Sequence, residues 1–286
     1  MILFLRFILF YFTCIKHAFV AFRFAKVGEY PSTISIRSKQ NQTHFCGGSL
    51  VDTIHAITAA CCLYPIKDNT SGFEIMGGDI YLYESVGFVA ATRQRFGFTV
   101  IIHELFNPKT KAHNVALMRL TNSVKPSFAL SRVSRQGGPT LSGIDCQIVG
   151  WGSRNNMKGP SSLLSNKLMV TDVVVAYSNV DIHNQNELCL TIKLTRKSCR
   201  KCTTIPKLCQ GDYGGAMLCN GNLAAIITST SICNGNNEPK VLTEISQYNT
   251  WIDRITSNPV YYSCTKKTIM CVVEFLTLWS VMLLFL

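Results

Sequence analysis

One loop of the sequence has the composition of a reactive loop. The segment LCQGDYGGAM, residues 208–217, sets a short acidic turn between glycines, which let a backbone approach a reacting carbonyl closely. The residue at its tip is Tyr213. A phenol has a pKa of about 10, so it stays protonated at neutral pH and needs a base beside it to act as a nucleophile. The segment therefore has the backbone of a nucleophile loop without an effective nucleophile.

The chain around this loop is a series of short strands. Between Ser32 and Thr250, runs of β-rich sequence alternate with turn clusters such as MGGD, RQGGPT and NGNN. The runs are TISIR, SLVDTIHAIT, FTVIIHEL, ALMRL, DCQIVGWG, KLMVTDVVVA, AMLCNGNLAAIITS and KVLTEI. The amphipathic segment SQYNTWIDRIT, residues 246–256, predicts one helix. Without a βαβ rhythm or an internal repeat, the pattern indicates an all-β fold of one or two antiparallel barrels.

Several segments, taken in order, resemble the chymotrypsin/trypsin family of secreted serine proteases. They are GEYPSTISIR, THFCGGSLV, AITAACC, HELFN, HNVALMRL, CQIVGWG, CQGDYGGAM and YNTWIDRI. The resemblance covers Lys26 to Thr256. It implies two six-stranded antiparallel barrels with the site in the cleft between them.

The resemblance assigns three positions to the family's catalytic triad. Acyl transfer by that triad needs a hydroxyl nucleophile, an imidazole base and a carboxylate that orients the imidazole. Here the imidazole position is Cys61, the carboxylate position is Asn114 and the hydroxyl position is Tyr213. His44 and His113 are near the site only in sequence, and we interpret them as barrel-surface residues.

Three hypotheses follow for the function. The first is a non-catalytic homologue that acts by binding, as a cofactor, decoy or regulator in extracellular proteolysis. The second is an active serine-type or cysteine-type endopeptidase with an unorthodox site, such as a Cys61 nucleophile, which would need a base beside it. The third is a structural membrane-attached protein whose cleft has no ligand.

The resemblance also places an oxyanion hole and a specificity pocket. Gly211 and the backbone N–H of Tyr213 match the positions that form the oxyanion hole in the family. The pocket positions are Lys207, Thr228, Ser229, Thr230 and Lys240. Two ammonium groups in one slot would repel each other, so we favour a collapsed pocket over a site that captures an acidic side chain.

Asp212 matches the carboxylate that pairs with a new amino terminus when family members are activated. The corresponding start here is FVAF at Phe19, preceded by Ala18 instead of a basic cleavage site. We expect signal-peptide removal to expose Phe19 directly, without a zymogen step.

The chain has 13 cysteines, an odd number. The resemblance implies the disulfides Cys46–Cys62, Cys146–Cys219 and Cys209–Cys233. The pairing of Cys61, Cys189, Cys199, Cys202 and Cys264 stays open. Cys199 and Cys202 lie in a loop with six basic residues, where a rerouted disulfide is favoured over a zinc site because no second ligand pair stands at the required spacing.

Both ends of the chain are apolar. Residues 1–18 predict a signal peptide, residues 19–256 the protease-like domain, residues 257–267 a linker, and residues 268–286 a membrane-associated tail that spans the bilayer or is replaced by a lipid anchor. The sequons at Asn41 and Asn69 predict N-glycosylation. Together these features predict the secretory pathway and an extracellular or cell-surface location.

The formal net charge of +12 favours acidic partners. We expect an extracellular protein partner, namely a protease, substrate or inhibitor, with an acidic protein or glycan as a candidate for the basic loop. No pattern indicates a cofactor or a metal, and the basic loop lacks the aromatic residues of a nucleic-acid platform.

Overall fold

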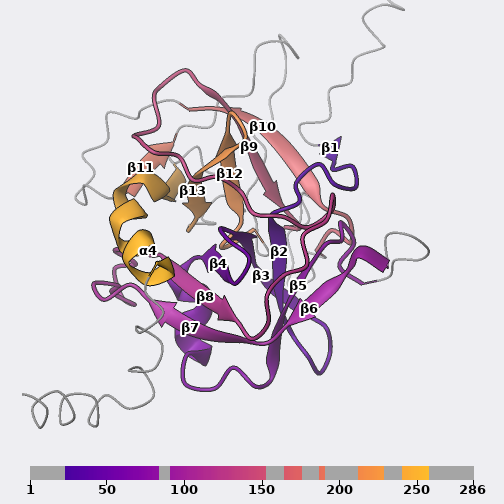
Figure 1. Ribbon diagram of the computed structural model, residues 1–286. Coiled ribbons are helices and arrows are strands. Elements are labelled where there is room, and N and C mark those ends of the chain that lie inside the picture. The colour runs from indigo at the N-terminus through magenta and orange to yellow at the C-terminus, as the bar shows by residue number, and fades with distance from the viewer. Residues whose placement is uncertain are drawn as a thin grey trace, which may run out of the picture. The chain divides into compact units, whose positions relative to one another are not determined.

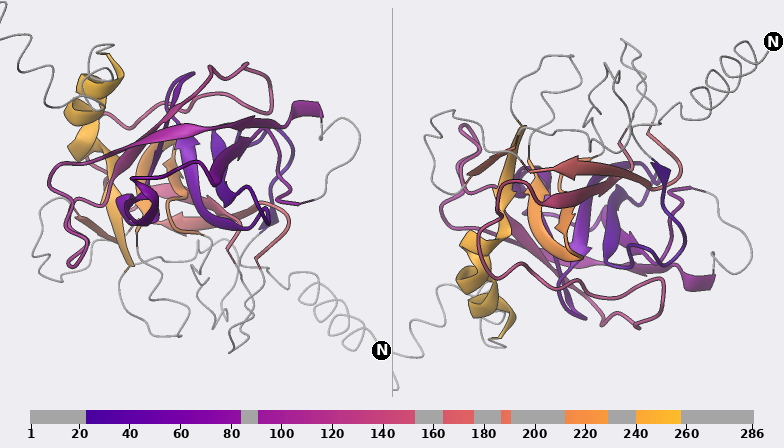
Figure 2. Two further views of the ribbon diagram at one scale, coloured as in Figure 1. Left: turned by 90° about the horizontal axis from the view of Figure 1, so that it is seen from below. Right: turned by 90° about the horizontal axis from the view of Figure 1, so that it is seen from above.

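The structure is a computed structural model that describes residues 23–83, 91–152, 164–175, 187–190, 212–228 and 240–257. The predicted signal peptide, linker and tail, and most of the basic loop, lie outside the described residues. The described part up to residue 247 is built from two antiparallel sheets, shown from three directions in Figures 1 and 2. The all-β prediction is confirmed.

The first sheet forms a closed barrel. Its strand order is β6-β5-β2-β3-β4-β8-β7, and its edge strands β6 and β7 follow each other in the chain with only Gly97 between them. Residues 94–102 therefore pair with β5 through β6 and with β8 through β7, and this closes the sheet into a barrel. The strands are β2 (Thr33–Ser38), β3 (His44–Leu50), β4 (His55–Thr58), β5 (Phe73–Gly77), β6 (Gln94–Phe96), β7 (Phe98–Ile102) and β8 (Ala116–Leu120).

The second sheet follows in the chain and has the order β1-β10-β9-β12-β13-β14-β11. Its strands are β1 (Arg23–Phe24), β9 (Asp145–Gly150), β10 (Met169–Val174), β11 (Glu187–Leu190), β12 (Ala216–Cys219), β13 (Asn222–Ile227) and β14 (Lys240–Glu244). Each sheet has seven described strands where six were expected. Gly97 divides one run of the first sheet into two strands, and the two-residue β1 adds an edge to the second.

The helices are short. α2 (Ala60–Leu63) and the 3-10 turn η1 (Tyr64–Ile66) follow β4, and the 3-10 turn η3 (Ile245–Tyr248) follows β14. The predicted helix near the end is α4 (Asn249–Thr256), which buries Trp251, Ile252 and Ile255 on one face. The short helical turn at α2 was not predicted, because four residues carry no helical periodicity.

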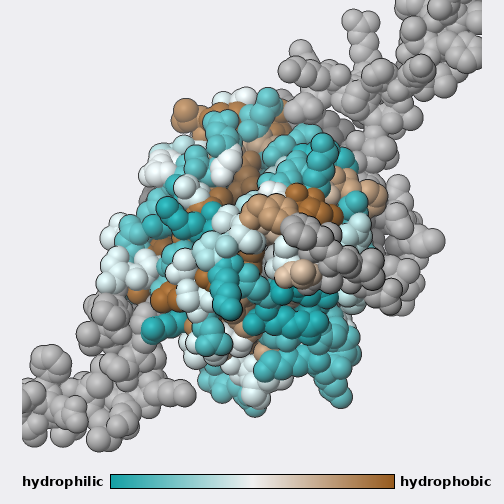
Figure 3. All heavy atoms as spheres, turned by 45° about the vertical axis from the view of Figure 1, so that its right-hand side comes forward, coloured by the Kyte–Doolittle hydropathy of each residue, from teal (hydrophilic) through white to brown (hydrophobic). Residues whose placement is uncertain are grey.

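Buried hydrophobic side chains fill the interior of both sheets. Ile34, Ile36, Ile75 and Leu117 are fully buried in the first sheet. The second encloses a cluster of Cys146, Ile148, Val173, Val175, Met217, Cys219, Ala224, Ala225, Ile227 and Leu242. On the face of the molecule that Figure 3 shows, hydrophobic residues form small groups among hydrophilic ones.

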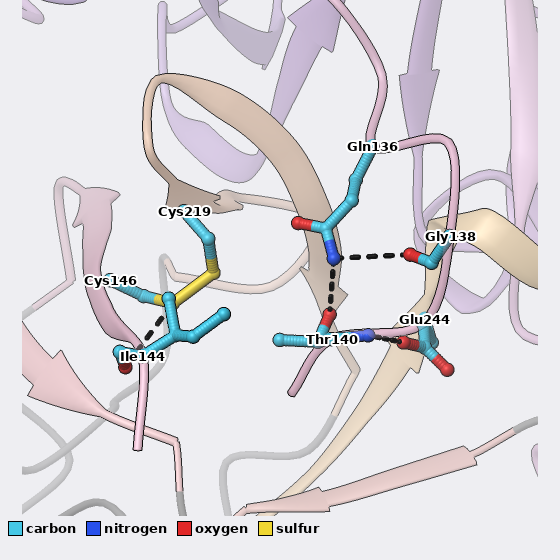
Figure 4. Close-up of a disulfide and its surroundings, with 7 residues drawn as sticks. All are labelled: Gln136, Gly138, Thr140, Ile144, Cys146, Cys219 and Glu244. Atoms are coloured by element: carbon cyan, nitrogen blue, oxygen red, sulfur yellow. Dashed lines mark hydrogen bonds between the residues drawn. A yellow bond between two sulfur atoms is a disulfide. The ribbon is translucent and has the colours of Figure 1, made fainter. Parts of the chain in front are cut away.

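Two disulfides are present among the described residues. Cys46–Cys62 joins β3 to α2, and Cys146–Cys219 joins the paired strands β9 and β12. Figure 4 shows the second bond beside a loop that Glu244 holds by accepting a hydrogen bond from the Thr140 N–H. Cys46–Cys62 and Cys146–Cys219 are two of the three disulfides that the resemblance implied. The third, Cys209–Cys233, lies outside the described residues.

Candidate functional site

The loop around Tyr213 lies where the two sheets meet. The N–H of Gly47 in β3 donates to the Tyr213 carbonyl at 2.7 Å, and the N–H of Gly214 donates to the Ile227 carbonyl at 2.9 Å. The Thr58 hydroxyl donates to the Gly47 carbonyl at 2.7 Å, directly beside Gly214. The loop is thus anchored to both sheets through its backbone, and the Tyr213 side chain is half-buried.

Cys61 and Asn114 come together through the pairing of β4 with β8. Thr58 is opposite Ala116 in that ladder, so α2 after β4 lies next to the segment before β8. The Cys61 N–H donates to Asn114 Oδ1 at 2.8 Å, and the Asn114 side chain is almost completely buried. Two of the three positions that the resemblance assigned to a triad are therefore in direct contact.

The Asn114 amide is held by one of its two polar atoms. Its Oδ1 accepts from Cys61, whereas its buried Nδ2 has no hydrogen-bond partner among the described residues. The Thr243 hydroxyl of β14 donates to the Asn114 carbonyl at 3.5 Å, which links this position to the second sheet. A neutral amide at this point can orient a neighbour but carries no negative charge to stabilise a cationic base.

Cys61 is a half-buried free thiol. Burial raises the pKa of this thiol, and the neighbouring Asn114 amide and Lys111 charge oppose the shift without overcoming it. The thiol is therefore protonated at neutral pH. Because the thiolate is the nucleophilic form, Cys61 is a weak nucleophile and a weak base in this setting.

We expect Cys61 to be alkylated by iodoacetamide more slowly in the folded protein than in urea at pH 7, because burial disfavours the reactive thiolate. The folded-state rate should keep rising with pH beyond the range where an exposed thiol has levelled off. Peptide mass mapping of the Cys61 peptide measures both rates. A folded protein that reacts as fast as the unfolded chain at pH 7 would show that the site activates the thiol.

Asp212 is a fully buried carboxylate that supports the loop. Its Oδ1 accepts from the Gly152 N–H at 3.0 Å. A Cβ at Gly150 or Gly152 would lie within 2.3 Å of the carboxylate, so the carboxylate occupies the space that a side chain would need there. This contact accounts for the Gly-Trp-Gly segment beside Asp212. Phe19, the predicted new amino terminus, lies outside the described residues.

The histidines near the site are not all surface residues. His44 is buried, its Nδ1 is 2.8 Å from the Ser35 hydroxyl, and its ring packs edge-on against Trp151. The interpretation of His44 as a barrel-surface residue was therefore wrong, because its ring is covered by Ser35 of the paired strand β2 and by Trp151, which is far away in the sequence. His113 is half-buried and stacks on His103 with ring centroids 5.2 Å apart.

Several predicted site residues lie outside the described residues. They are Gly211, Lys207, Ser229, Thr230, Cys199, Cys202, Cys209, Cys233 and Cys264, together with the side chains of Cys189 and Lys240. Thr228 follows β13 and is half-buried. The oxyanion hole and the specificity pocket thus stay predictions. Thr58, which borders the Tyr213 loop, was missed because a lone threonine in a strand gives no sequence signal.

This arrangement of two antiparallel sheets, with a glycine-rich loop anchored where they meet, matches the chymotrypsin-like fold. The model of the Trypsin family matches residues 19–252, so this chain belongs to the trypsin family. Serine protease 57 of Rattus norvegicus is 27% identical over 223 residues, which cover 76% of this chain and 76% of that protein. Trypsin-3 of Salmo salar is 26% identical over 230 residues, covering 77% and 87%.

A solved structure has the same fold. Neuropsin, described as a serine protease expressed in the limbic system of mouse brain, superposes with a TM-score of 0.66 at 24% identity. The match covers 82% of this chain and 98% of that one. The two-sheet architecture of the family is thereby shown for most of the chain.

Proposed function

We propose that this chain is a non-catalytic member of the trypsin family that acts by binding another extracellular protein. The observation that carries the proposal is the contact between Cys61 and Asn114. The family mechanism needs an imidazole and a carboxylate at these two positions. A protonated thiol and a neutral amide replace them here, and they are joined by the Cys61 backbone N–H.

The nucleophile position supports the same conclusion. Tyr213 would need a base to remove its phenolic proton, and the residue at the base position is a thiol whose pKa is raised by burial. The backbone of the loop is nevertheless fixed to both sheets. A fold that keeps this loop between its two sheets but lacks the reactive side chains of the family suits recognition of a protease, a substrate or an inhibitor.

A cysteine-type endopeptidase is the second candidate. The free thiol of Cys61 and the buried Nδ2 of Asn114, which has no hydrogen-bond partner in the described part of the chain, are the observations in its favour, because an amide donor near a thiol favours the thiolate. The raised pKa of the thiol counts against it.

The proposed location is the secretory pathway and the cell exterior. Two disulfides suit an oxidising compartment. No helix of the described residues is both long and apolar enough to cross a bilayer, and the predicted tail lies outside them. Membrane attachment by that tail, and docking of an acidic protein or glycan on the basic loop, are further parts of the proposal.

Hydrolysis of a broad peptide library by the purified secreted protein tests the proposal. We expect no turnover from the native chain, from Cys61→Ala or from Tyr213→Phe, because each lacks a base–nucleophile pair. An active trypsin assayed in parallel provides the positive control. Turnover that Cys61→Ala abolishes would establish the cysteine-type alternative, and turnover that Tyr213→Phe abolishes would establish a phenol-based site.

A further inference from the structure

The fold places the two sequons of the chain on neighbouring loops. Asn41 lies in the turn between β2 and β3, and Asn69 lies in the loop from η1 to β5. Strand β2 pairs with both β3 and β5, and its last residue Ser38 is opposite Phe73, the first residue of β5. Both loops therefore leave the first sheet at the same end.

Lys39 holds the two loops side by side. Its N–H donates to the Gly72 carbonyl at 2.9 Å, and its ammonium group donates to the Ser71 carbonyl at 2.8 Å. The rings of Phe45 in β3 and Phe73 in β5 also pack edge to face, with centroids 5.5 Å apart. The spacing of the sequons is thus fixed by backbone, side-chain and aromatic contacts.

Both sequons have the same local geometry. Asn41 Oδ1 accepts from the Thr43 N–H at 3.1 Å, and Asn69 Oδ1 accepts from the Ser71 N–H at 3.0 Å and from its hydroxyl at 2.7 Å. These are Asx turns, in which the side-chain carbonyl caps the residue two positions on. Both asparagines and both hydroxyl residues are exposed. Among the described residues, neither asparagine uses Nδ2 in a hydrogen bond.

We propose that Asn41 and Asn69 both carry N-linked oligosaccharides and that the two glycans form one continuous cover over this end of the first sheet. In each transfer, Nδ2 attacks the anomeric carbon of a lipid-pyrophosphate oligosaccharide. The C–N bond forms, the anomeric C–O bond breaks, and the lipid pyrophosphate leaves with the electron pair. One Nδ2 proton passes to a base of the transferase. The exposed Nδ2 atoms let the folded product keep both glycans.

The glycan cover would restrict how a partner approaches. The Cys46–Cys62 disulfide joins β3 to α2, and α2 leads through η1 into the Asn69 loop. The Asn69 glycan therefore lies on the loop that follows α2, the helix that contains Cys61. The Asn41 glycan lies on the turn that precedes β3, the strand that the disulfide joins to α2. A macromolecule would be kept from this end of the first sheet and would have to dock elsewhere.

The first test is glycosidase treatment of the full chain expressed in cultured animal cells. We expect peptide N-glycosidase to lower the apparent mass in two steps, with one step lost in Asn41→Gln or Asn69→Gln and both lost in the double variant. Thr43→Ala should remove the Asn41 step, whereas Thr43→Ser, which restores the sequon, should keep it. A chain whose mobility does not change on treatment would overturn the proposal.

The second test asks whether the two glycans form one cover. Lys39 and Lys67 are exposed, and each lies two residues before a sequon asparagine. Acylation by a bulky amine reagent, read by peptide mass mapping, should be several-fold faster at both lysines in the double variant than in the native protein. Each single variant should speed the reaction at both lysines. Acceleration confined to the lysine beside the lost glycan would show two independent glycans and overturn the shared cover.

Discussion

Replacing Gly214 with alanine is expected to lower the free energy of unfolding by about 4 kcal/mol or more. Losses of this size occur when a new side chain has no space in the folded structure. The new Cβ would lie 2.1 Å from the Thr58 hydroxyl oxygen and 2.4 Å from the Gly47 carbonyl oxygen. Gly214 also has φ +74°, a conformation that costs an alanine about 1–2 kcal/mol. Because these contacts join the two sheets, the whole described junction would have to shift. Urea denaturation followed by tryptophan fluorescence measures the change.

Gly221→Ala is the matched control for this prediction. Gly221 has φ +78°, close to that of Gly214, but nothing lies within 4 Å of its added Cβ. We expect this variant to lose only the backbone-strain contribution of about 1–2 kcal/mol. If Gly214→Ala lowered the free energy of unfolding no more than Gly221→Ala does, the inferred close packing of β3 against the Tyr213 loop would be contradicted.

Strand content was predictable from the sequence where a short run rich in β-branched and other apolar residues stood between turns. β7, β8, β9 and β10 fall within predicted runs, and β2 extends one residue beyond the run TISIR, to Ser38. The run SLVDTIHAIT is instead two strands, because Asp52 Oδ1 accepts the N–H groups of Ile54 and His55 and forms a turn. This hydrogen-bonded turn is local in sequence, but the mainly apolar composition of the run favours one continuous strand and so hides the turn.

The strand β5 was missed for a different reason. Its last residue, Gly77, belongs to the MGGD cluster, which predicts a turn. In the structure a Cβ at Gly77 would lie 2.6 Å from Leu130, so this glycine makes room for a side chain from a distant segment. A glycine that serves packing cannot be told from one that serves a turn without knowing what lies opposite.

The candidate site could be located from sequence only through the resemblance. Order along the chain assigned Cys61, Asn114 and Tyr213 to one cleft, and the β4–β8 pairing does bring the first two into contact. The raised pKa of the Cys61 thiol was not predictable, because it depends on burial by segments far away in sequence. The same applies to the burial of His44 against Trp151.

Removing one charge from a buried ion pair is the second change with a large expected effect. Arg37 is 1% exposed, and its Nε donates to Glu74 Oε1 at 3.1 Å while its Nη1 donates to the Leu82 carbonyl at 2.9 Å. Burial lowers the pKa of Arg37, and the positive charge of Arg95 adds to that shift, so Glu74 is the group that favours the charged guanidinium. Glu74 also accepts from Arg95 at 3.1 Å.

We therefore expect Glu74→Gln to lower the free energy of unfolding by about 3 kcal/mol, since it leaves a buried guanidinium without a counter-charge. Glu29→Gln makes the same chemical change in the exposed pair with Arg23, where the loss should be about 1 kcal/mol or less. Urea denaturation at low and at high salt separates the two cases, because salt screens the exposed pair and hardly affects the buried one. Equal losses in the two variants would mean that water reaches Arg37, and the buried pair would then be an ordinary surface contact.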